Sequence, residues 1–262
     1  YAKQKSYHDN FLDVHYDQSF VDEEKKFFES IKKLKKFKIV DTEYLMNKNI
    51  NRGKNILAEG AQGTLLDIDF GSYPFVTSSN TTTAGACIGL GISPNKILNV
   101  FGIFKAYCTR VGAGPFPTEL FDDIGKKIAS NGNEFGSTTG RARRCGWLDI
   151  PALKYSIMLN GVTELYMMKA DVLSDFNEIK VCVGYNYNGE KIDYFPSSIE
   201  SENISPIYKT FQGWTSKSNK AQKFEDLEKN FQSYVRFIED QVGVKINLIS
   251  LGPVREQTIY IN

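Results

Sequence analysis

The stretch from Asn133 to Trp147, NEFGSTTGRARRCGW, gathers glycines, hydroxyl side chains and arginines into one short segment. Gly136 and Gly140 allow the backbone to turn its N–H groups toward a ligand. Donors that suit a carboxylate or a phosphate come from Ser137, Thr138, Thr139, Arg141, Arg143 and Arg144. The segment therefore predicts an anion-binding loop. The alternative is a solvated basic surface turn, because short motifs of this kind also occur by chance.

A helix is expected directly after this loop. Asp149 and Pro151 are typical of a helix start, apolar residues follow at helical spacing, and Asn160 and Gly161 are typical of a helix end. The loop would then lie beside a helix N-terminus, whose dipole favours negative charge.

Polar residues also follow two apolar runs. The carboxylate of Asp171, after the run 164–168, can accept hydrogen bonds from two N–H donors of guanine that adenine does not present, while the Lys169 stem lies across the base. Ser250, Leu251 and Gly252, after the last apolar run, would complete this guanine site through backbone groups. A structural salt bridge or a plain loop is the alternative for the KAD segment.

Two more polar side chains suit a purine ligand. Gln62 has an amide that matches a purine edge, and Thr77 has a hydroxyl group. The alternative for each is a polar residue that stabilises its own loop.

These residues must be positioned by elements that alternate along the chain. After a loose lead-in at 1–18, we expect helices at 21–38, 84–91, 118–130, 149–160 and 224–242, and strands at 55–59, 97–111, 164–168, 178–187 and 245–251. The cap of the second helix is expected among Ser79, Asn80 and Thr81. Residues 188–223 show few periodic signals. The alternation predicts an α/β fold with a mainly parallel central sheet flanked by helices.

Composition excludes several classes. Lys plus Arg (32) nearly balance Asp plus Glu (31), so no overall field favours nucleic acid or an anionic membrane. No apolar run approaches the roughly 18 residues of a membrane-spanning helix and no signal peptide is evident, so a cytoplasmic location is expected. No metal-ligand spacing links the cysteines and histidines, which are Cys87, Cys108, Cys145, Cys182, His8 and His15. We expect no metal site within this chain.

The usual phosphate cradle, G-x-x-x-x-G-K-[ST], does not occur. If a nucleoside triphosphate reacts here, another segment must bind its phosphates and supply the magnesium ligands and the base.

Five segments together closely resemble the adenylosuccinate synthetase family. They are EGAQGTLLDID at 59–69, TSSNT at 77–81, TRVGAGPFPTE at 109–119, GSTTGRARRCGW at 136–147 and KAD at 169–171. The resemblance runs from about Ile56 to the C-terminus and is weaker between Asn188 and Lys223. It implies a P-loop-NTPase-like family fold and a ligase of purine biosynthesis. Such an enzyme transfers the γ-phosphoryl group of GTP to O6 of inosine monophosphate, after which L-aspartate displaces phosphate to give adenylosuccinate.

The resemblance also implies which residues bind each substrate. Inosine monophosphate would contact Gln62, Thr77, Val111 and Arg141. L-Aspartate would contact Ser137, Thr138, Thr139, Gly140, Arg141, Ala142 and Arg143, although Ala142 stands where the family often has proline or arginine. GTP would contact Arg143, Lys169, Ala170, Asp171, Ser250, Leu251 and Gly252. Within this chain, Gln62 and Arg143 are the expected catalytic residues.

The family's phosphate loop, catalytic aspartate and histidine, and Mg²⁺ ligands precede the resembling region. The chain begins at Tyr1 and its first methionine is Met46. We therefore expect a single α/β domain fragment that is inactive alone, with a lead-in and a lysine-rich helix at 1–50 and a nucleotide- and aspartate-binding region at 51–262. The family also implies a homodimer with Mg²⁺ as cofactor, and no nucleic-acid or membrane partner is expected.

Two alternatives remain open. One is a non-catalytic guanine-nucleotide-binding module that another chain complements. The other is a nucleic-acid-binding protein that uses the lysines of the 21–38 helix, which the near-zero net charge supports poorly.

Overall fold

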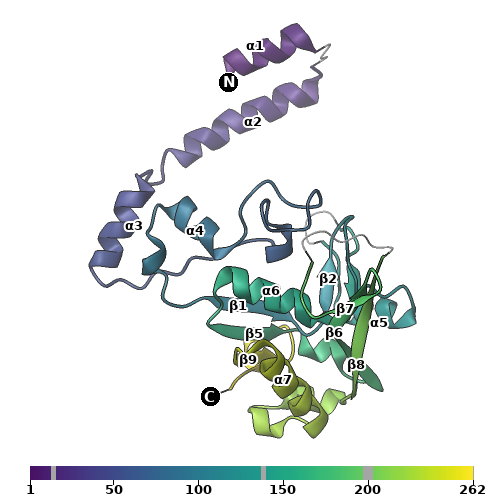
Figure 1. Ribbon diagram of the computed structural model, residues 1–262. Coiled ribbons are helices and arrows are strands. Elements are labelled where there is room, and N and C mark those ends of the chain that lie inside the picture. The colour runs from purple at the N-terminus through teal and green to yellow at the C-terminus, as the bar shows by residue number, and fades with distance from the viewer. Residues whose placement is uncertain (13–15, 137–139, 197–202, 262) are drawn as a thin grey trace. The chain divides into compact units, whose positions relative to one another are not determined.

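The computed structural model describes residues 1–12, 16–136, 140–196 and 203–261. The described chain forms two compact units, residues 1–53 and 54–262 (Figure 1). Three residues expected in the aspartate loop, Ser137, Thr138 and Thr139, lie outside the described ranges.

The first unit consists of helices α1 (Ala2–Phe11), α2 (Gln18–Leu34) and α3 (Thr42–Asn51). The predicted lysine-rich helix is confirmed as α2, but the expected loose lead-in is wrong because α1 is helical. A short helix is marginal on its own, and α1 is held against α2 by side chains. Lys5 forms a 3.0 Å ion pair with Glu24, and the Tyr1 ring packs edge-on against Phe28 at 5.1 Å.

The second unit alternates strands and helices. Its helices are α4 (Thr83–Leu90), α5 (Asp123–Asn131), α6 (Ile150–Asn160) and α7 (Lys229–Val242). Its strands are β1 (Phe101–Lys105), β2 (Cys108–Arg110), β3 (Arg144–Gly146), β4 (Leu148–Asp149), β5 (Glu164–Met168), β6 (Glu178–Tyr187), β7 (Glu190–Ile192), β8 (Ile204–Gln212), β9 (Ile246–Ser250) and β10 (Thr258–Tyr260).

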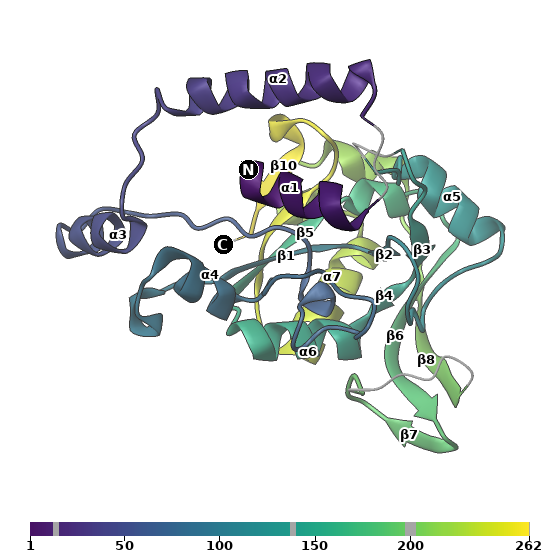
Figure 2. The same cartoon turned by 90° about the horizontal axis from the view of Figure 1, so that it is seen from above.

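Three sheets connect these strands, and the α/β class is confirmed. In the order β1-β5-β9-β10, the first three strands run parallel and β10 is antiparallel to β9. Strand β6 pairs in parallel with β4 and antiparallel with β7 and β8, and β2 pairs antiparallel with β3. Two of the three sheets are therefore mixed, the β2-β3 sheet is antiparallel, and parallel pairing is concentrated at β1, β5 and β9. Figure 2 shows β6, β7 and β8 extending together away from β1 and β5.

Strands β7 and β8 fall inside the polar stretch 188–223, for which no strand was expected. Strand β8 pairs with β6 along nearly its whole length, from Ile204 opposite Tyr187 to Gln212 opposite Glu178. The pairing partner is distant in sequence, so the strand is stabilised by a ladder of hydrogen bonds that local periodicity does not reveal.

The apolar run 97–111 is not one central strand, as expected, but two strands in different sheets. The chain turns between them at Ala106 and Tyr107, which are 0% and 1% exposed. The hydroxyl group of Tyr234 donates a 2.6 Å hydrogen bond to the Ala106 carbonyl, and this bond holds the turn in the core. Among the described strands, β1 pairs only with β5, so it lies at the edge of its sheet.

The strand expected at 55–59 is absent. These residues are exposed and pair with no described strand. An extended segment becomes a strand only when its backbone groups find a partner, which composition alone does not guarantee.

The core of this unit is built around aromatic stacking. Trp214 is 2% exposed and stacks on Phe231 with ring centroids 4.2 Å apart and planes 8° from parallel. Gly213, which precedes this tryptophan, is required because a Cβ atom there would overlap the Phe176 carbonyl oxygen. Helix α7 supplies Phe231 and, through Tyr234 and Ile238, contributes further fully buried side chains.

Helix α6 begins at its predicted cap. The Asp149 carboxylate accepts a 3.1 Å hydrogen bond from the Ala152 N–H, and Gly161 ends the helix with φ 61°. However, Asp149 is 4% exposed and Ile150 is 0% exposed. The cap and core residues therefore cover this helix N-terminus, and the expectation that the anion loop lies beside it and gains from its dipole stays a prediction.

The cap expected for the 84–91 helix is also placed differently. Helix α4 starts after Thr82, which forms no side-chain cap. The first-turn N–H of Thr83 instead donates to Asn160 Oδ1 at 2.8 Å. Asn160 provides this cap from 77 positions away in the sequence. The residues around position 80 therefore could not indicate it.

We predict that the buried Asp149 makes stability fall as pH rises from about 4 to 6. Burial raises its pKa to about 6, and hydrogen bonds from Tyr185 and Ala152 only partly oppose this shift. Because the folded carboxyl group binds its proton more tightly than the unfolded one, its contribution is complete below the unfolded pKa and is lost as pH rises through 6. The Asp149→Asn variant should lack this dependence in urea unfolding measured from pH 4 to 7.

The exposed N-cap Asp122 of α5 provides the matched control, because it makes the same kind of cap bond, to Gly125 N at 3.1 Å, without burial. A stability difference between wild type and Asp149→Asn that is constant over this pH range would contradict the prediction.

Candidate functional site

The parallel strands β1, β5 and β9 bring three groups of polar residues to one edge of the sheet. The carboxyl ends of adjacent parallel strands lie together, and this edge is where open α/β sheets place ligands. Lys105 ends β1, Lys169 and Asp171 follow β5, and Ser250 ends β9. The two segments predicted to recognise guanine are therefore neighbours in space, although about 80 positions separate them in sequence.

Lys169 is held in a defined position after β5. Its backbone is left-handed, with φ 58°, at the start of the short 3₁₀ helix Ala170–Leu173. Its ammonium group donates to the Gly132 carbonyl at 2.6 Å and to the Glu134 carboxylate at 3.0 Å. Burial raises the pKa of Asp171, and Lys169 partly opposes that shift. Burial thus disfavours the charged form of the Asp171 carboxylate, and hydrogen bonds from a ligand's N–H groups would stabilise that form.

The segment 250–252, at the end of β9, is closely packed. Ser250 Oγ donates a 2.9 Å hydrogen bond to the Gly252 carbonyl, and Leu251 is 1% exposed. A Cβ atom at Gly252 would overlap the side-chain amide of Gln257. Gln257 was not singled out from the sequence, because nothing local to it indicates that β10 returns the chain to this position.

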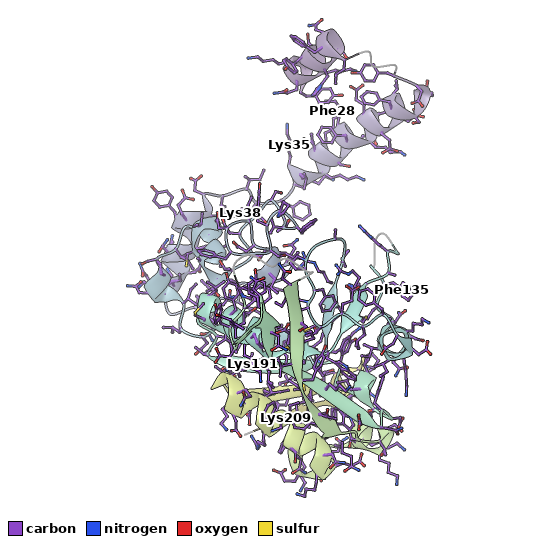
Figure 3. All side chains as sticks on the ribbon, turned by 45° about the vertical axis from the view of Figure 1, so that its right-hand side comes forward. Phe28, Lys35, Lys38, Phe135, Lys191 and Lys209 are labelled. Atoms are coloured by element: carbon purple, nitrogen blue, oxygen red, sulfur yellow. The ribbon has the colours of Figure 1, made fainter. Side chains whose placement is uncertain are left out.

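The described residues on either side of the predicted anion loop, 133–136 and 140–143, pair as the two arms of a hairpin. Phe135 and Ala142 form an antiparallel bridge, and Arg143 N donates to the Glu134 carbonyl at 2.9 Å. Gly140 has φ 63° and its N–H donates to the Gly136 carbonyl at 2.8 Å, while the Gly136 N–H donates to the Arg141 carbonyl at 2.8 Å. The N–H groups of these two glycines therefore bond within the hairpin, and anion binding by the loop stays a prediction. Phe135 is 49% exposed at the outer edge of this unit (Figure 3).

The arginines of this segment have different surroundings. Arg143 NH1 forms a 2.7 Å ion pair with Glu134. Arg144 instead pairs with Glu119 through Nε at 2.8 Å and donates to the carbonyls of Gly112 and Gly114. Arg144 therefore fixes the loop after β2, and its expected contribution to anion binding is wrong.

Glu134 is the centre of the site, and sequence analysis did not single it out. It is 0% exposed, and its carboxylate is surrounded by hydrogen-bond donors that favour the ionised form. It accepts hydrogen bonds from Lys105 at 2.8 and 2.9 Å, from Arg143 and Lys169, and from the hydroxyl group of Tyr107. Burial alone would raise its pKa, but these donors outweigh burial and lower the pKa to about 2.

The residues expected to bind inosine monophosphate lie on adjoining loops. The Arg141 guanidinium lies beside Gly112, where a Cβ atom would be 3.9 Å from NH1, so it is close to the chain at Val111. Val111 is 48% exposed. Arg110 joins this region to the segment before Thr77, because its NH2 group donates to Ser72 Oγ at 2.9 Å and to the Phe75 carbonyl at 3.0 Å.

Gln62 and Thr77 are carried by a loop that Asp67 holds together. The fully buried Asp67 accepts N–H bonds from Asp69 at 2.9 Å and Phe70 at 3.1 Å through Oδ1, and from Thr81 at 2.6 Å and Thr82 at 3.4 Å through Oδ2. Gln62 has φ 62° and is exposed.

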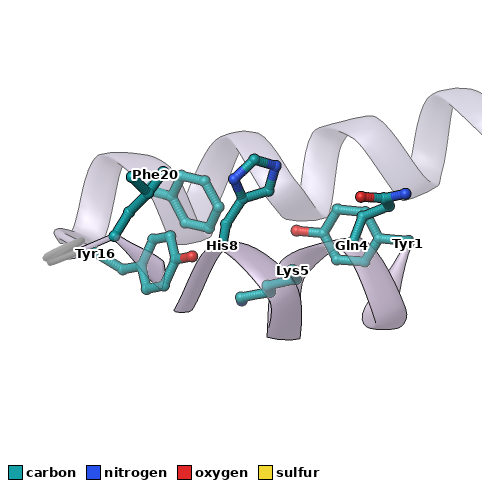
Figure 4. A pocket seen from close by; sticks show the side chains of 7 residues that line it. Tyr1, Gln4, Lys5, His8, Tyr16 and Phe20 are labelled. Carbon is teal, nitrogen blue, oxygen red and sulfur yellow. The ribbon is translucent and has the colours of Figure 1, made fainter. Parts of the chain in front are cut away.

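A hollow of ≈ 340 Å³ lies between α1 and α2 in the first unit (Figure 4). It is lined by Tyr1, Gln4, Lys5, His8, Leu12, Tyr16 and Phe20. No candidate nucleotide- or aspartate-binding residue contributes to it.

The described ranges offer neither a metal-binding cluster nor a membrane-spanning helix. They contain no group of three His, Cys, Asp or Glu side chains arranged to hold a metal ion. No helix in them is both long and apolar enough to span a membrane.

A model of the adenylosuccinate synthetase family matches residues 1–259. The chain belongs to the adenylosuccinate synthetase family. The match also includes the helices of the first unit, which extends the resemblance beyond the start expected near Ile56.

Individual relatives agree with this assignment. The chain is 57% identical over 260 residues to adenylosuccinate synthetase of Bacteroides fragilis, covering 99% of this chain and 61% of the relative. It is 57% identical over 249 residues to that of Flavobacterium johnsoniae, covering 95% and 59%. The fully ligated Plasmodium falciparum adenylosuccinate synthetase structure matches with a TM-score of 0.93 at 40% identity, covering 100% of this chain and 62% of that one. The chain thus spans about three fifths of the length of these adenylosuccinate synthetases.

We predict that Asp67→Asn disrupts the loop that carries Gln62 and Thr77. Each carboxylate oxygen faces two backbone donors, so either orientation of the amide places its NH₂ group against N–H groups. Leaving these donors unsatisfied should cost about 1–3 kcal/mol in urea unfolding. Amide hydrogen exchange should also become faster at residues 69–70 and 81–82.

The exposed Asp69, whose side chain accepts from Asn80 at 2.7 Å, provides the control. Asp69→Asn should leave exchange at these four amides unchanged, and equal effects of the two variants would contradict the anchoring role of Asp67.

Proposed function

We propose that the chain supplies the guanine-binding region, the aspartate loop and part of the inosine monophosphate site of an enzyme that joins L-aspartate to inosine monophosphate at the expense of GTP. The observation that supports this most directly is the cluster at Glu134. It places the hairpin arginine Arg143 beside the lysine of the KAD segment at a sheet edge suited to ligands. Membership of the adenylosuccinate synthetase family supplies the reaction.

In the proposed complex, the candidate site residues bind or orient the three substrates. Asp171 accepts hydrogen bonds from guanine. The aliphatic stem of Lys169 covers the base, while Glu134 holds the ammonium group of Lys169. Arg143 faces the GTP phosphates and, with Arg141 and the hairpin backbone, holds the carboxylate of L-aspartate. Gln62, Thr77 and Val111 contact inosine monophosphate.

Mg²⁺ is the expected cofactor, but the described residues do not fit it. Mg²⁺ prefers an octahedral set of oxygen ligands that includes carboxylates, and the described ranges hold no suitable acidic cluster. We therefore assign no step to the metal, and propose that its ligands, the phosphate loop and the catalytic aspartate and histidine come from outside these 262 residues. A homodimer and a cytoplasmic location are also proposals from the family resemblance.

One alternative has a specific basis. The chain spans 61% of the relative from Bacteroides fragilis and has no G-x-x-x-x-G-K-[ST] motif. A guanine-nucleotide-binding module that another chain complements would have the same features.

The guanine site is tested by binding of GDP and ADP to the chain, measured by calorimetry. Wild type should prefer GDP, and Asp171→Asn should reduce that preference by about 5- to 150-fold, because the amide leaves a guanine donor without an acceptor, at a cost of about 1–3 kcal/mol. The control is Asp175→Asn, four residues further on, whose side chain accepts the Ser216 N–H at 3.0 Å. Equal GDP and ADP affinities in wild type would disprove the guanine assignment.

Catalysis is tested by incubating the chain with GTP, inosine monophosphate, L-aspartate and Mg²⁺. The 262 residues alone should form no adenylosuccinate, because they hold no phosphate loop. Product formation by the chain alone would refute the proposal that essential residues lie outside it. Restored activity on adding a separate chain with the phosphate loop would favour the module described above.

A further inference from the structure

Glu134 joins three cations that come from three separate parts of the chain. Lys105 ends β1, Arg143 closes the hairpin, and Lys169 follows β5. Their nitrogen atoms lie 2.8, 2.7 and 3.0 Å from the carboxylate. The carboxylate is therefore a single connection between the hairpin that carries the expected aspartate loop and the segment expected to recognise guanine.

The cations lie between this carboxylate and solvent. The side chain of Glu134 is 0% exposed, whereas those of Lys105, Arg143 and Lys169 are 25%, 30% and 36% exposed. One negative charge faces three positive charges, so the cluster itself carries an excess of positive charge toward the exposed side.

The donors are only partly used by Glu134. An arginine has five N–H donors, and the bond to the carboxylate takes one from NH1 of Arg143. The ammonium group of Lys169 has three donors, of which two are directed to Glu134 and to the Gly132 carbonyl. Lys105 differs, because its ammonium group makes three bonds, two to Glu134 and one to Thr109 Oγ1. Glu134 thus fixes the directions of Arg143 and Lys169 and leaves each of these two cations with donors for an anion.

Backbone bonds transmit this constraint to the hairpin. The Glu134 carbonyl accepts the Arg143 N–H at 2.9 Å, so the same residue holds both the backbone and the side chain of Arg143. A ligand that orders Lys169 would restrict the Glu134 carboxylate, which in turn restricts Arg143 and the base of the loop. Two sites that share one ordered element bind cooperatively.

We propose, on the basis of the function proposed above, that Glu134 is a positioning residue that couples guanine-nucleotide binding at Lys169 to L-aspartate binding at the hairpin. The coupling is reciprocal: each ligand tightens the binding of the other by the same factor. Glu134 itself contacts neither ligand.

The test is calorimetric titration of the 262-residue chain with GDP and with L-aspartate, each alone and in the presence of the other. In wild type, GDP should lower the Kd of L-aspartate by at least about 5-fold, which is the usual lower range of such coupling. In Glu134→Gln, both Kd values should rise and the coupling factor should fall to about 1. Mere destabilisation would weaken both ligands without removing the factor between them.

Two further variants keep the test decisive. Glu239→Gln removes another buried carboxylate, whose side chain is 3% exposed and pairs with Arg236 at 2.6 Å, and it should leave the coupling factor unchanged. If Glu134→Gln does not fold, as judged by near-ultraviolet circular dichroism, Glu134→Asp replaces it. Glu134→Asp keeps the charge, but its shorter side chain cannot hold Arg143 and Lys169 together, so the coupling should again be lost.

The outcomes separate the two proposals. Coupling that persists in a folded Glu134 variant would overturn the positioning role and leave the proposed function intact. Absence of GDP and L-aspartate binding in wild type would overturn the proposed function, and the positioning role with it.

Discussion

The site depends on one electrostatic constraint, which is the burial of the Glu134 carboxylate. A buried charge is costly unless it is paired and hydrogen-bonded. Glu134 meets this requirement only when the end of β1, the hairpin and the segment after β5 come together, since each supplies one cation. The same pairing that neutralises the carboxylate therefore sets the directions of Arg143 and Lys169.

The parallel order of β1, β5 and β9 makes this meeting possible. Parallel neighbours end at the same edge, so segments that follow different strands become adjacent. The core beneath them fixes the edge: Tyr234 of α7 bonds the Ala106 carbonyl where the chain leaves β1. The turn at Ala106 thus connects the packing of α7 in the core to the position of Lys105 in the site.

Hydrogen-bonded loops, rather than regular elements, carry the remaining candidate residues. Asp67 satisfies four backbone donors around Gln62 and Thr77, and Arg144 binds the carbonyls on both sides of Ala113. Irregular backbone needs such partners because its polar groups have no ladder or helix to satisfy them. Arg144, which the sequence suggested as an anion-binding residue, serves this purpose instead.

The sequence by itself determined the α/β class, helices such as 150–160, the strands at 164–168, 178–187 and 246–250, and the family. Local periodicity and turn residues carry that information. Only the tertiary structure decided that 97–111 divides between two sheets and that β8 pairs with β6. It also decided that Arg144 holds the loop after β2 by bonding its carbonyls. It alone also revealed Glu134. A glutamate beside a glycine-rich loop has no local mark of burial, because its burial is produced by cations that the fold brings from distant positions.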